Sequence, residues 1–305
     1  MKRELALAYA ALVAVCIIWG TTYLALRIAV LHFPPLLFTA IRQSIAGFLL
    51  LAILLAIGQF KLPPKAHLIR MAIGGFLMIS MGNGLVAWAE MEIPSGIAAI
   101  ICSLMPVMVI LINLAVNREE KPTWPIVIGV LIGMAGIVTI FSEHVNEFAK
   151  TEYQVGIVLI LLAVLGWALG SIWIKKQPAD SNPFVNAGLQ MLFGGLWLFP
   201  FSFLFDDLQN VHWSGESLYS LLYLIAFGSI IAYASYLYAL KKLPMTIVSL
   251  YAYVNPLVAV ILGWLILDEK LNTTIGIGIL ITIGGIYMVN RGYQISRLWK
   301  PKTVN

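Results

Sequence analysis

The sequence predicts an all-α membrane protein in which ten transmembrane helices form two inverted five-helix repeats. Three observations lead to this fold class: the composition, ten apolar segments of membrane-spanning length, and a second half that repeats the first. Of the 305 residues, 61% are hydrophobic and 11% are charged, whereas soluble domains average about 45–50% and about 25%. Ten spans of about 20 residues each leave little chain for a soluble domain.

Each predicted span is an apolar run bounded by short polar or Pro/Gly-containing segments. The runs are 5–28, 35–57, 68–89, 94–116, 124–141, 154–174, 183–205, 217–240, 245–267 and 273–290. They are too uniformly apolar for alternating barrel strands, and a helix satisfies its own backbone groups in lipid. The first run exceeds the apolar core of a signal peptide and lacks a small-residue cleavage site, so we assign it as the first helix.

The loop charges predict the orientation. With the N-terminus in the cytoplasm, most of the 19 Lys and Arg residues fall on the inner side. Only Arg27, Lys150 and Lys270 fall outside, and Arg42 lies within a span. The positive-inside rule therefore predicts a multi-pass protein of the inner or plasma membrane with both termini cytoplasmic. It also accounts for the excess of basic residues, so we expect no nucleic-acid partner.

The second half echoes the first at a period near 149 residues. Trp19 matches Trp167 and Pro35 matches Pro183 at an offset of 148, while Pro94/Pro244, Pro106/Pro256 and Glu119/Glu269 match at 150. We expect two units, 1–150 and 151–305. Five spans per unit place the second unit upside down, and the loop charges agree because the acidic 90–92 connection matches the basic 240–242 connection.

Inverted repeats are typical of secondary transporters, which hold substrate near the midplane between the repeats and work by alternating access. We therefore expect an exporter of small organic metabolites, with a channel, a lipid translocator or a membrane-embedded enzyme as the alternatives. No phosphate-cradling motif and no metal-ligand spacing is present, so we expect no cofactor. Because no acidic residue is predicted near the midplane, proton coupling, exchange and uniport all stay open, as does the oligomeric state.

The sequence also resembles the drug/metabolite transporter superfamily, and within it the EamA type. The resemblance covers nearly the whole chain as two tandem units. It is carried by Ile18-Trp19-Gly20-Thr21-Thr22-Tyr23, by Ala40-Ile41-Arg42, by Ser103-Leu104-Met105-Pro106-Val107 before Glu119, and by Tyr253-Val254-Asn255-Pro256-Leu257 before Asp268-Glu269. It implies a ten-helix basket with both termini inside that usually exports small metabolites such as amino acids. The second unit departs from the first where Gln190 replaces Arg42.

Arg42 is the first candidate for substrate binding. A charge within the membrane is costly and usually faces a cavity or a partner. By helical rise, Arg42, Trp19 and Asn83 lie at a similar depth, about 10–12 Å below the outer surface. We predict that Arg42 binds a carboxylate or another anionic group beside the aromatic wall of Trp19. The alternatives are that Arg42 snorkels outward or bonds to helix carbonyls.

Other polar and aromatic side chains are predicted to line the same site. Tyr233 and Tyr236 share one face of the eighth span, and Tyr251 and Asn255 share one face of the ninth. Such residues suit a small-ligand pocket, although interface belts and interhelical contacts also use them. The predicted binding set is Trp19, Thr22, Arg42, Asn83, Trp167, Tyr233, Tyr236, Tyr251 and Asn255.

Pro106 and Pro256 are the candidate hinges. Each lies about eleven or twelve residues into its span, which places both near the middle of the bilayer. A proline within a helix frees a carbonyl and bends the axis. Interruptions at matching positions of two halves are typical of transporter sites, whereas a static kink is the alternative.

Overall fold

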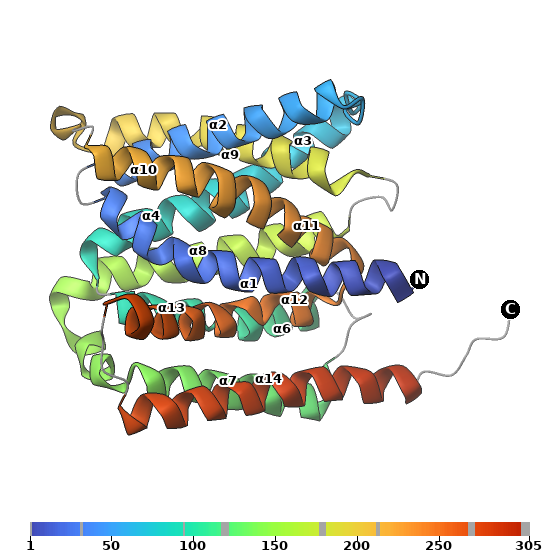
Figure 1. The fold of residues 1–305 in the computed structure, drawn as a ribbon, viewed down its shortest axis with the longest axis vertical. Helices are drawn as coiled ribbons and strands as arrows, with labels where there is room; N and C mark the ends of the chain where they lie inside the picture. Colours follow the sequence, from blue (N-terminus) through green and yellow to red (C-terminus); the bar gives the residue numbers. More distant parts are fainter. Residues whose placement is uncertain are drawn as a thin grey trace, which may run out of the picture.

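The structure is a computed structural model that describes residues 2–30, 33–93, 95–116, 122–176, 181–211, 214–267 and 272–299. Within these ranges every regular element is a helix (Figure 1). Nine helical stretches of the described chain are long and apolar enough to cross a membrane, and α7 with the helix bent from it by 87° gives a tenth. The predicted all-α membrane fold is confirmed.

The first half contains α1 to α7, and the third, fourth and fifth spans are each built from more than one element. The bounds are α1 Lys2–Val30, α2 Pro35–Ala56, α3 Lys65–Gly75, the π-helix η1 Phe76–Gly84, α4 Leu85–Glu92, α5 Ser95–Cys102, α6 Met105–Val116, α7 Trp124–Ile140 and the 3₁₀ helix η2 Ser142–Ala149.

The second half has the same order of elements. The bounds are η3 Thr151–Tyr153, α8 Gln154–Lys175, α9 Pro183–Phe205, η4 Leu208–Asn210, α10 Gly215–Tyr223, the π-helix η5 Leu224–Ile231, α11 Ala232–Lys242, α12 Met245–Ser249, α13 Tyr251–Leu267 and α14 Thr273–Trp299. The predicted bounds of the first nine spans agree with these to within three residues. The tenth helix is longer than predicted and reaches Trp299.

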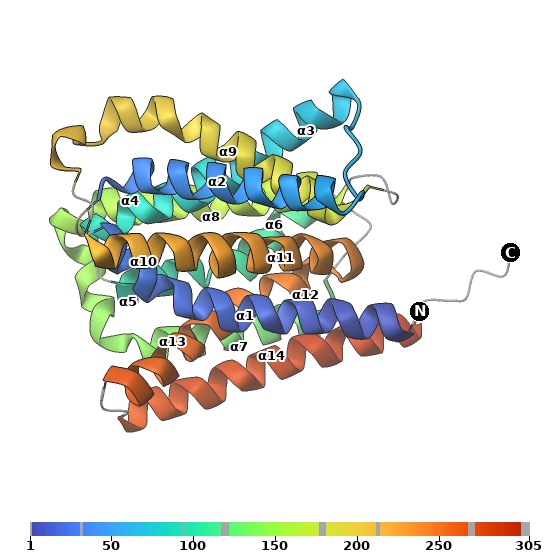
Figure 2. The ribbon, with the colours of Figure 1, turned by 45° about the horizontal axis from the view of Figure 1, so that its top comes forward.

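The two halves run in opposite directions. In Figure 1, α1 begins beside the N-terminus and runs to the other side of the molecule, whereas α8, its counterpart, runs back toward the side of the N-terminus. We call the side where α1 begins and α14 ends the terminal face, and the other side the opposite face. Figure 2 shows the same antiparallel arrangement from another angle.

Packing between the halves follows the repeat. The counterpart helices α2 and α9 pack against each other, and so do α7 and α14. Helix α1 packs against α11 and α13, while α8 packs against α4 and α6. Exchanging the halves therefore maps each of these contacts onto another one, as expected for two copies of one module.

Proline and polar caps fix where the second span of each half begins. Pro35 and Pro183 occupy the first turns of α2 and α9, where a missing N–H costs nothing. At the other end of α9, Asp206 caps α2 across the repeat boundary: its carboxylate accepts the N–H of Leu37 at 2.7 Å and that of Leu36 at 3.4 Å. The α2–α9 pair is thus joined at the opposite face by a charged cap as well as by packing.

The third span of each half contains a π-helix at a matching place, η1 in one and η5 in the other. A π-helical turn holds an extra residue, and such turns often occur at functional sites. The sequence analysis predicts a plain helix at both places, because the apolar pattern carries no sign of the wider turn.

The fourth and ninth spans are both interrupted, and neither break falls at the proline itself. Helix α5 ends at Cys102 and α6 begins at Met105, so Pro106 stands in the first turn of α6 rather than in mid-helix. Pro256 lies inside α13, and the break in that span is at Leu250. Glu119 and Glu269, which the repeat pairs, lie outside the described residues.

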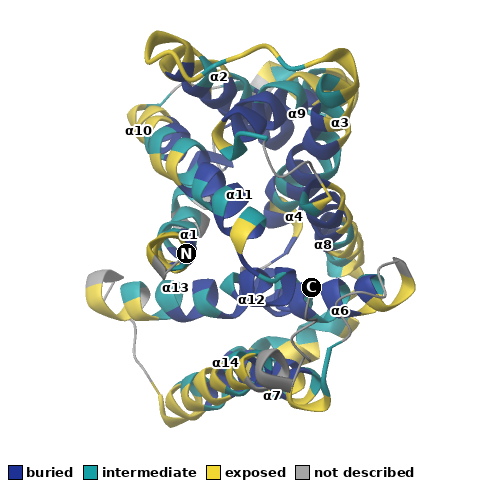
Figure 3. Cartoon of the chain, turned by 90° about the vertical axis from the view of Figure 1, so that its right-hand side faces the viewer, coloured by how far each residue is buried: buried dark blue, intermediate teal, exposed yellow. Residues whose placement is uncertain are grey.

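The outer surface of the bundle is apolar, as lipid contact requires. Leu204, Phe203 and Leu280 are about 70% exposed, and many similar side chains lie on the outside. Figure 3 shows buried faces turned toward the bundle interior and exposed faces turned outward. Lipid is the environment in which such a surface is stable.

Glycine allows the close contact between α7 and α14. A Cβ at Gly285 of α14 would lie 2.3 Å from the backbone N of Gly133, whereas one at the neighbouring Gly284 would meet nothing within 4 Å. Small residues such as Gly133 and Gly285 let the two helix backbones approach.

Candidate functional site

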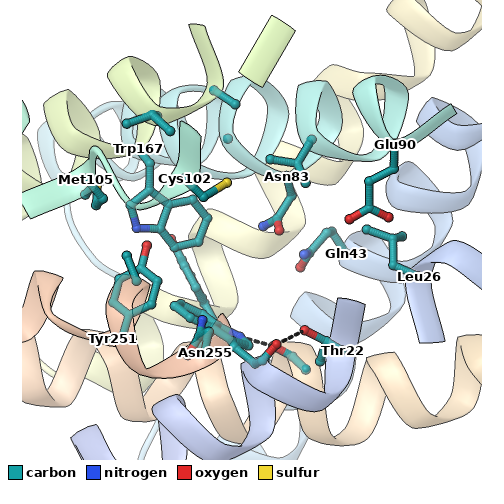
Figure 4. Close-up of a pocket in the computed structure, with 18 of the residues that line it drawn as sticks. Thr22, Leu26, Gln43, Asn83, Glu90, Cys102, Met105, Trp167, Tyr251 and Asn255 are labelled. Atoms are coloured by element: carbon teal, nitrogen blue, oxygen red, sulfur yellow. Dashed lines mark hydrogen bonds between the residues drawn. The ribbon is translucent and has the colours of Figure 1, made fainter. Parts of the chain in front are cut away.

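A cavity with a volume of about 120 Å³ lies between the two halves (Figure 4). It has room for several water molecules, and its wall includes residues of α1, α2, α4, α8 and α13. Eight of the nine residues predicted to bind substrate line it: Trp19, Thr22, Arg42, Asn83, Trp167, Tyr233, Tyr251 and Asn255. Residues far apart in the sequence thus meet at one place between the repeats.

Tyr236, the ninth predicted residue, lies behind the wall rather than on it. Its side chain is 1% exposed, and its ring packs against those of Trp19 at 5.3 Å and Trp167 at 5.7 Å between centroids. Its hydroxyl forms a hydrogen bond of 2.7 Å with the Ser171 hydroxyl. Tyr236 therefore supports the residues that do line the cavity.

The two matching tryptophans meet at the cavity. The rings of Trp19 and Trp167 lie edge to face with centroids 5.4 Å apart, a favourable aromatic geometry. Tyr251 packs against Trp19 at 5.0 Å and Tyr233 against Trp167 at 6.0 Å. The sequence predicts the matching positions of the tryptophans but not their contact.

A glycine of η1 makes room for Trp167. A Cβ at Gly82 would lie 2.5 Å from Cε3 of the Trp167 ring, so a larger residue there would displace the indole. Gly82 itself lines the cavity. The π-helix thus places bare backbone against the aromatic wall.

The two indole N–H groups differ. Trp19 Nε1 donates a hydrogen bond of 2.9 Å to the carbonyl of Gly228 in η5. Trp167 Nε1 is buried and has no hydrogen-bond partner in the part of the chain that the structure describes. One indole therefore anchors a helix, while the nitrogen of the other is buried beside Tyr236, with which it interacts.

Arg42 is buried on the cavity wall, at 5% exposure. Its Nε has no hydrogen-bond partner among the described residues, and its side chain makes no hydrogen bond there to a helix carbonyl. Glu90 interacts with it electrostatically. A buried guanidinium is stable only with compensating groups, and Glu90 on the same wall is one such group.

Glu90 and Gln43 also line the cavity, and the sequence analysis misses both as site residues. It places Glu90 at the outer edge of its span, whereas the structure buries that side chain to 6% exposure. The spacing of Asn83, Val86 and Glu90 puts them on one helix face, and all three line the cavity. That periodicity is the signal that identifies Glu90.

The polar and aromatic groups are separated along the cavity. In Figure 4, Glu90 and Gln43 lie toward one end and Trp167 and Tyr251 toward the other. With its amide turned so that nitrogen donates, Asn255 bonds to the carbonyl of Tyr251 at 2.9 Å and to that of Cys16 at 3.1 Å. Asn255 thereby ties α13 to α1 at the aromatic end.

The residues four positions before the two prolines also lie on the cavity wall. These are Cys102 before Pro106 and Ala252 before Pro256. A proline has no N–H to donate to the carbonyl four residues earlier. Each proline therefore stands about one helical turn after a residue of the cavity wall.

A ladder of contacts joins α8 and α11 between the cavity and the terminal face. Trp167 packs against Tyr233 at 6.0 Å, and Ser171 bonds to Tyr236. At the end of the ladder Lys175 donates to the carbonyl of Leu240 at 2.7 Å. We call these three contacts the α8–α11 seam.

The comparisons with known proteins agree with this arrangement. Residues 6–142 and 154–291 both match the model of the EamA-like transporter family. The chain is 33% identical over 292 residues to the uncharacterized inner membrane transporter YedA of Escherichia coli strain K12, covering 95% of this chain and 92% of the relative. It is 30% identical over 287 residues to Protein PecM of Dickeya dadantii, covering 93% of each chain.

A more distant relative and a solved structure extend the likeness. The uncharacterized transporter YoaV of Bacillus subtilis is 26% identical over 278 residues, covering 91% of this chain and 94% of the relative. A solved crystal structure of a protein matches with a TM-score of 0.78 at 19% identity, covering 98% of this chain and 100% of that one. At that identity the structural match concerns the fold.

Proposed function

The chain belongs to the EamA-like transporter family, and from that premise we propose that it exports small organic metabolites across the inner or plasma membrane by alternating access. The family and the relatives are transporters rather than enzymes. The observation that carries the proposal is the cavity between the repeats, where a buried Arg42 faces the same space as aromatic rings from both halves. Transporter sites lie at such repeat interfaces.

The cavity wall indicates the substrate class. Arg42 offers donors for a carboxylate, and Trp19 and Trp167 offer apolar surface for the rest of a small molecule. Pockets with mostly apolar walls and a few placed polar groups suit small ligands. We therefore propose substrates that carry an anionic group on a compact organic body, such as amino acids or related compounds.

The proposed orientation places the terminal face in the cytoplasm, with both chain ends there. The positive-inside rule supports it, because Lys175, Lys241 and Lys242 are at the ends of helices that reach this face. Attaching a reporter domain to each terminus and measuring its accessibility to protease in intact cells tests this orientation. Cleavage of either reporter from outside contradicts it.

The coupling mode is proposed to be exchange, uniport or proton antiport. Purified protein in proteoliposomes distinguishes these: flux that is unchanged by a pH gradient excludes obligatory proton coupling. The sequence contains no phosphate-cradling motif, so it gives no support for direct use of ATP.

One experiment tests the proposed function. It measures the solutes in spent medium from cells that lack or overproduce the protein. We expect at least one small anionic or zwitterionic metabolite whose extracellular level rises with protein dose. Arg42→Gln at equal abundance is expected to abolish that rise, whereas Arg291→Gln, at an exposed residue of α14, is the matched control. If Arg42→Gln exports as well as wild type, Arg42 does not bind the substrate.

A further inference from the structure

Arg42 and Gln190 occupy matching positions in α2 and α9, but their surroundings differ. The offset of 148 that aligns Pro35 with Pro183 also aligns these two residues. Arg42 lines the cavity. Gln190 is 0% exposed and accepts a hydrogen bond of 2.7 Å from the hydroxyl of Tyr233 through Oε1. It is not part of the cavity wall.

The helices that face these two residues differ in the same way. In the second half, Tyr233, Tyr236 and Leu240 are packed into the α8–α11 seam. At the offset of 150, their counterparts in the first half are Asn83, Val86 and Glu90, and all three line the cavity. In the first half this face borders the cavity as far as Glu90, whereas in the second half only Tyr233 of the three borders it.

Two copies of one module thus adopt two conformations in a single chain. Because the copies are inverted, an exchange of their conformations would extend the cavity toward the terminal face in place of the opposite face. In the exchanged state α2 takes the surroundings that α9 has now. Arg42 then faces Asn83 within a closed seam, and the Asn83 carbonyl is an acceptor for the guanidinium.

Resting on the proposed function, we propose that Arg42 and Gln190 alternate on the cavity wall. The substrate meets a guanidinium when the cavity opens to the opposite face, and an uncharged amide when it opens to the terminal face. Gln190 is thus a binding residue of the state in which the halves are exchanged. The affinity for an anionic group differs between the two faces of the membrane.

The chain supplies its own reporter for a test that needs no known substrate. Cys16 and Cys102 are its two cysteines, and Cys102 lines the cavity. In a Cys16→Ser background, Cys102 reacts with impermeant methanethiosulfonates, either the anionic sulfonatoethyl or the cationic trimethylammonioethyl reagent. Right-side-out and inside-out vesicles present the two faces separately. The measured quantity is the ratio of the anionic to the cationic reaction rate.

The proposal predicts effects that depend on the face. Arg42→Gln lowers the ratio on the order of 10-fold for reagents applied at the opposite face, because a nearby positive charge attracts one reagent and repels the other. The ratio from the terminal face stays the same. Gln190→Glu lowers the ratio from the terminal face alone, and it keeps an acceptor for the Tyr233 hydroxyl. Arg291→Gln, which removes a positive charge far from the cavity, changes neither ratio.

Two results overturn the alternation of Arg42 and Gln190. One is a fall in the ratio from both faces with Arg42→Gln, and the other is an unchanged terminal-face ratio with Gln190→Glu. If the Arg42→Gln protein does not fold, the Gln190→Glu result decides on its own. If Cys102 reacts with reagents applied at only one face in every variant, that result contradicts alternating access itself and thus the proposed function.

Discussion

Trp19 and Trp167 occupy the same place in the two repeats and touch edge to face, with ring centroids 5.4 Å apart. Their indole N–H groups nevertheless make different contacts. Trp19 Nε1 is bonded to the Gly228 carbonyl, whereas Trp167 Nε1 has no hydrogen-bond partner among the described residues. We propose that these matching residues take two roles in this state, a structural one for Trp19 and a binding one for Trp167 on the cavity wall.

Phenylalanine substitutions separate these two roles. Trp19→Phe removes a hydrogen bond between α1 and η5 and is expected to lower the free energy of unfolding by about 0.5–1.5 kcal/mol. Trp167→Phe loses no such bond, and we expect a higher KM for the transported solute with a smaller effect on stability. Thermal unfolding in detergent and transport kinetics measure the two effects. Equal losses of stability in the two variants contradict the assignment.

Adjacent glycines of α14 provide a matched pair for the α7–α14 contact. Gly285→Ala places a Cβ 2.3 Å from the Gly133 backbone N, whereas Gly284→Ala adds a methyl group in open space. We expect Gly285→Ala to cost about 1–3 kcal/mol of stability, as overpacking generally does. Gly284→Ala is expected to be near neutral. Detergent unfolding midpoints of the two variants decide, and similar midpoints contradict the close contact.

The Asp206 cap predicts a pH dependence of stability. Partial burial, the largest cause, raises the pKa of the Asp206 carboxyl above its ordinary value, while hydrogen bonds from Ser202, Leu37 and Leu36 oppose the rise. The folded protein therefore binds this proton more readily than the unfolded chain does. Its contribution to stability is complete below the ordinary Asp pKa and is lost as pH rises through the folded-state value.

Unfolding in detergent between about pH 3 and pH 6 measures the slope of the free energy of unfolding against pH. Asp206→Asn removes the titrating group and is expected to remove its share of the slope. Asp207→Asn makes the same change at an exposed neighbour, and we expect it to leave that share intact. Asp206→Ala also removes the cap of α2, at a cost of about 1 kcal/mol. An unchanged slope in Asp206→Asn is evidence against the raised pKa.

The two prolines are predicted to differ in effect although they match in the repeat. Pro256 stands inside α13, so Pro256→Ala restores a backbone N–H and straightens a helix that adjoins the cavity. We expect a several-fold lower maximal transport rate with little change in KM. Pro106 lies in the first turn of α6, where proline is tolerated, and Pro106→Ala is expected to have a smaller effect. Equal effects on the rate contradict this difference.

The sequence predicts the spans well because a bilayer imposes one length and one polarity on every helix. It also predicts which residues gather at the site, since Arg42, Trp19 and Asn83 follow from depth alone. Depth does not reveal which way a helix face turns. For this reason the sequence does not predict that Tyr236 lies behind the wall, since its spacing to Tyr233 puts both on one face.

Features that depend on the partner helix cannot be read from one span. The π-helices η1 and η5 leave the apolar pattern intact, so nothing in the sequence indicates their extra residue. The Lys175 contact with the Leu240 carbonyl joins segments 65 residues apart. Glu90 is assigned to the outer edge because it is near the end of its span, yet the neighbouring helices bury it beside Arg42.

The pairing of α2 with α9 and of α7 with α14 has a consequence for how the chain can be divided. Each repeat finds its largest packing partners in the other repeat, so we expect that neither unit folds on its own. We expect a chain cut between Lys150 and Thr151 to regain its shape only by reassociation of both fragments. A fragment made alone exposes to lipid the glycine-lined surface that its missing twin would cover.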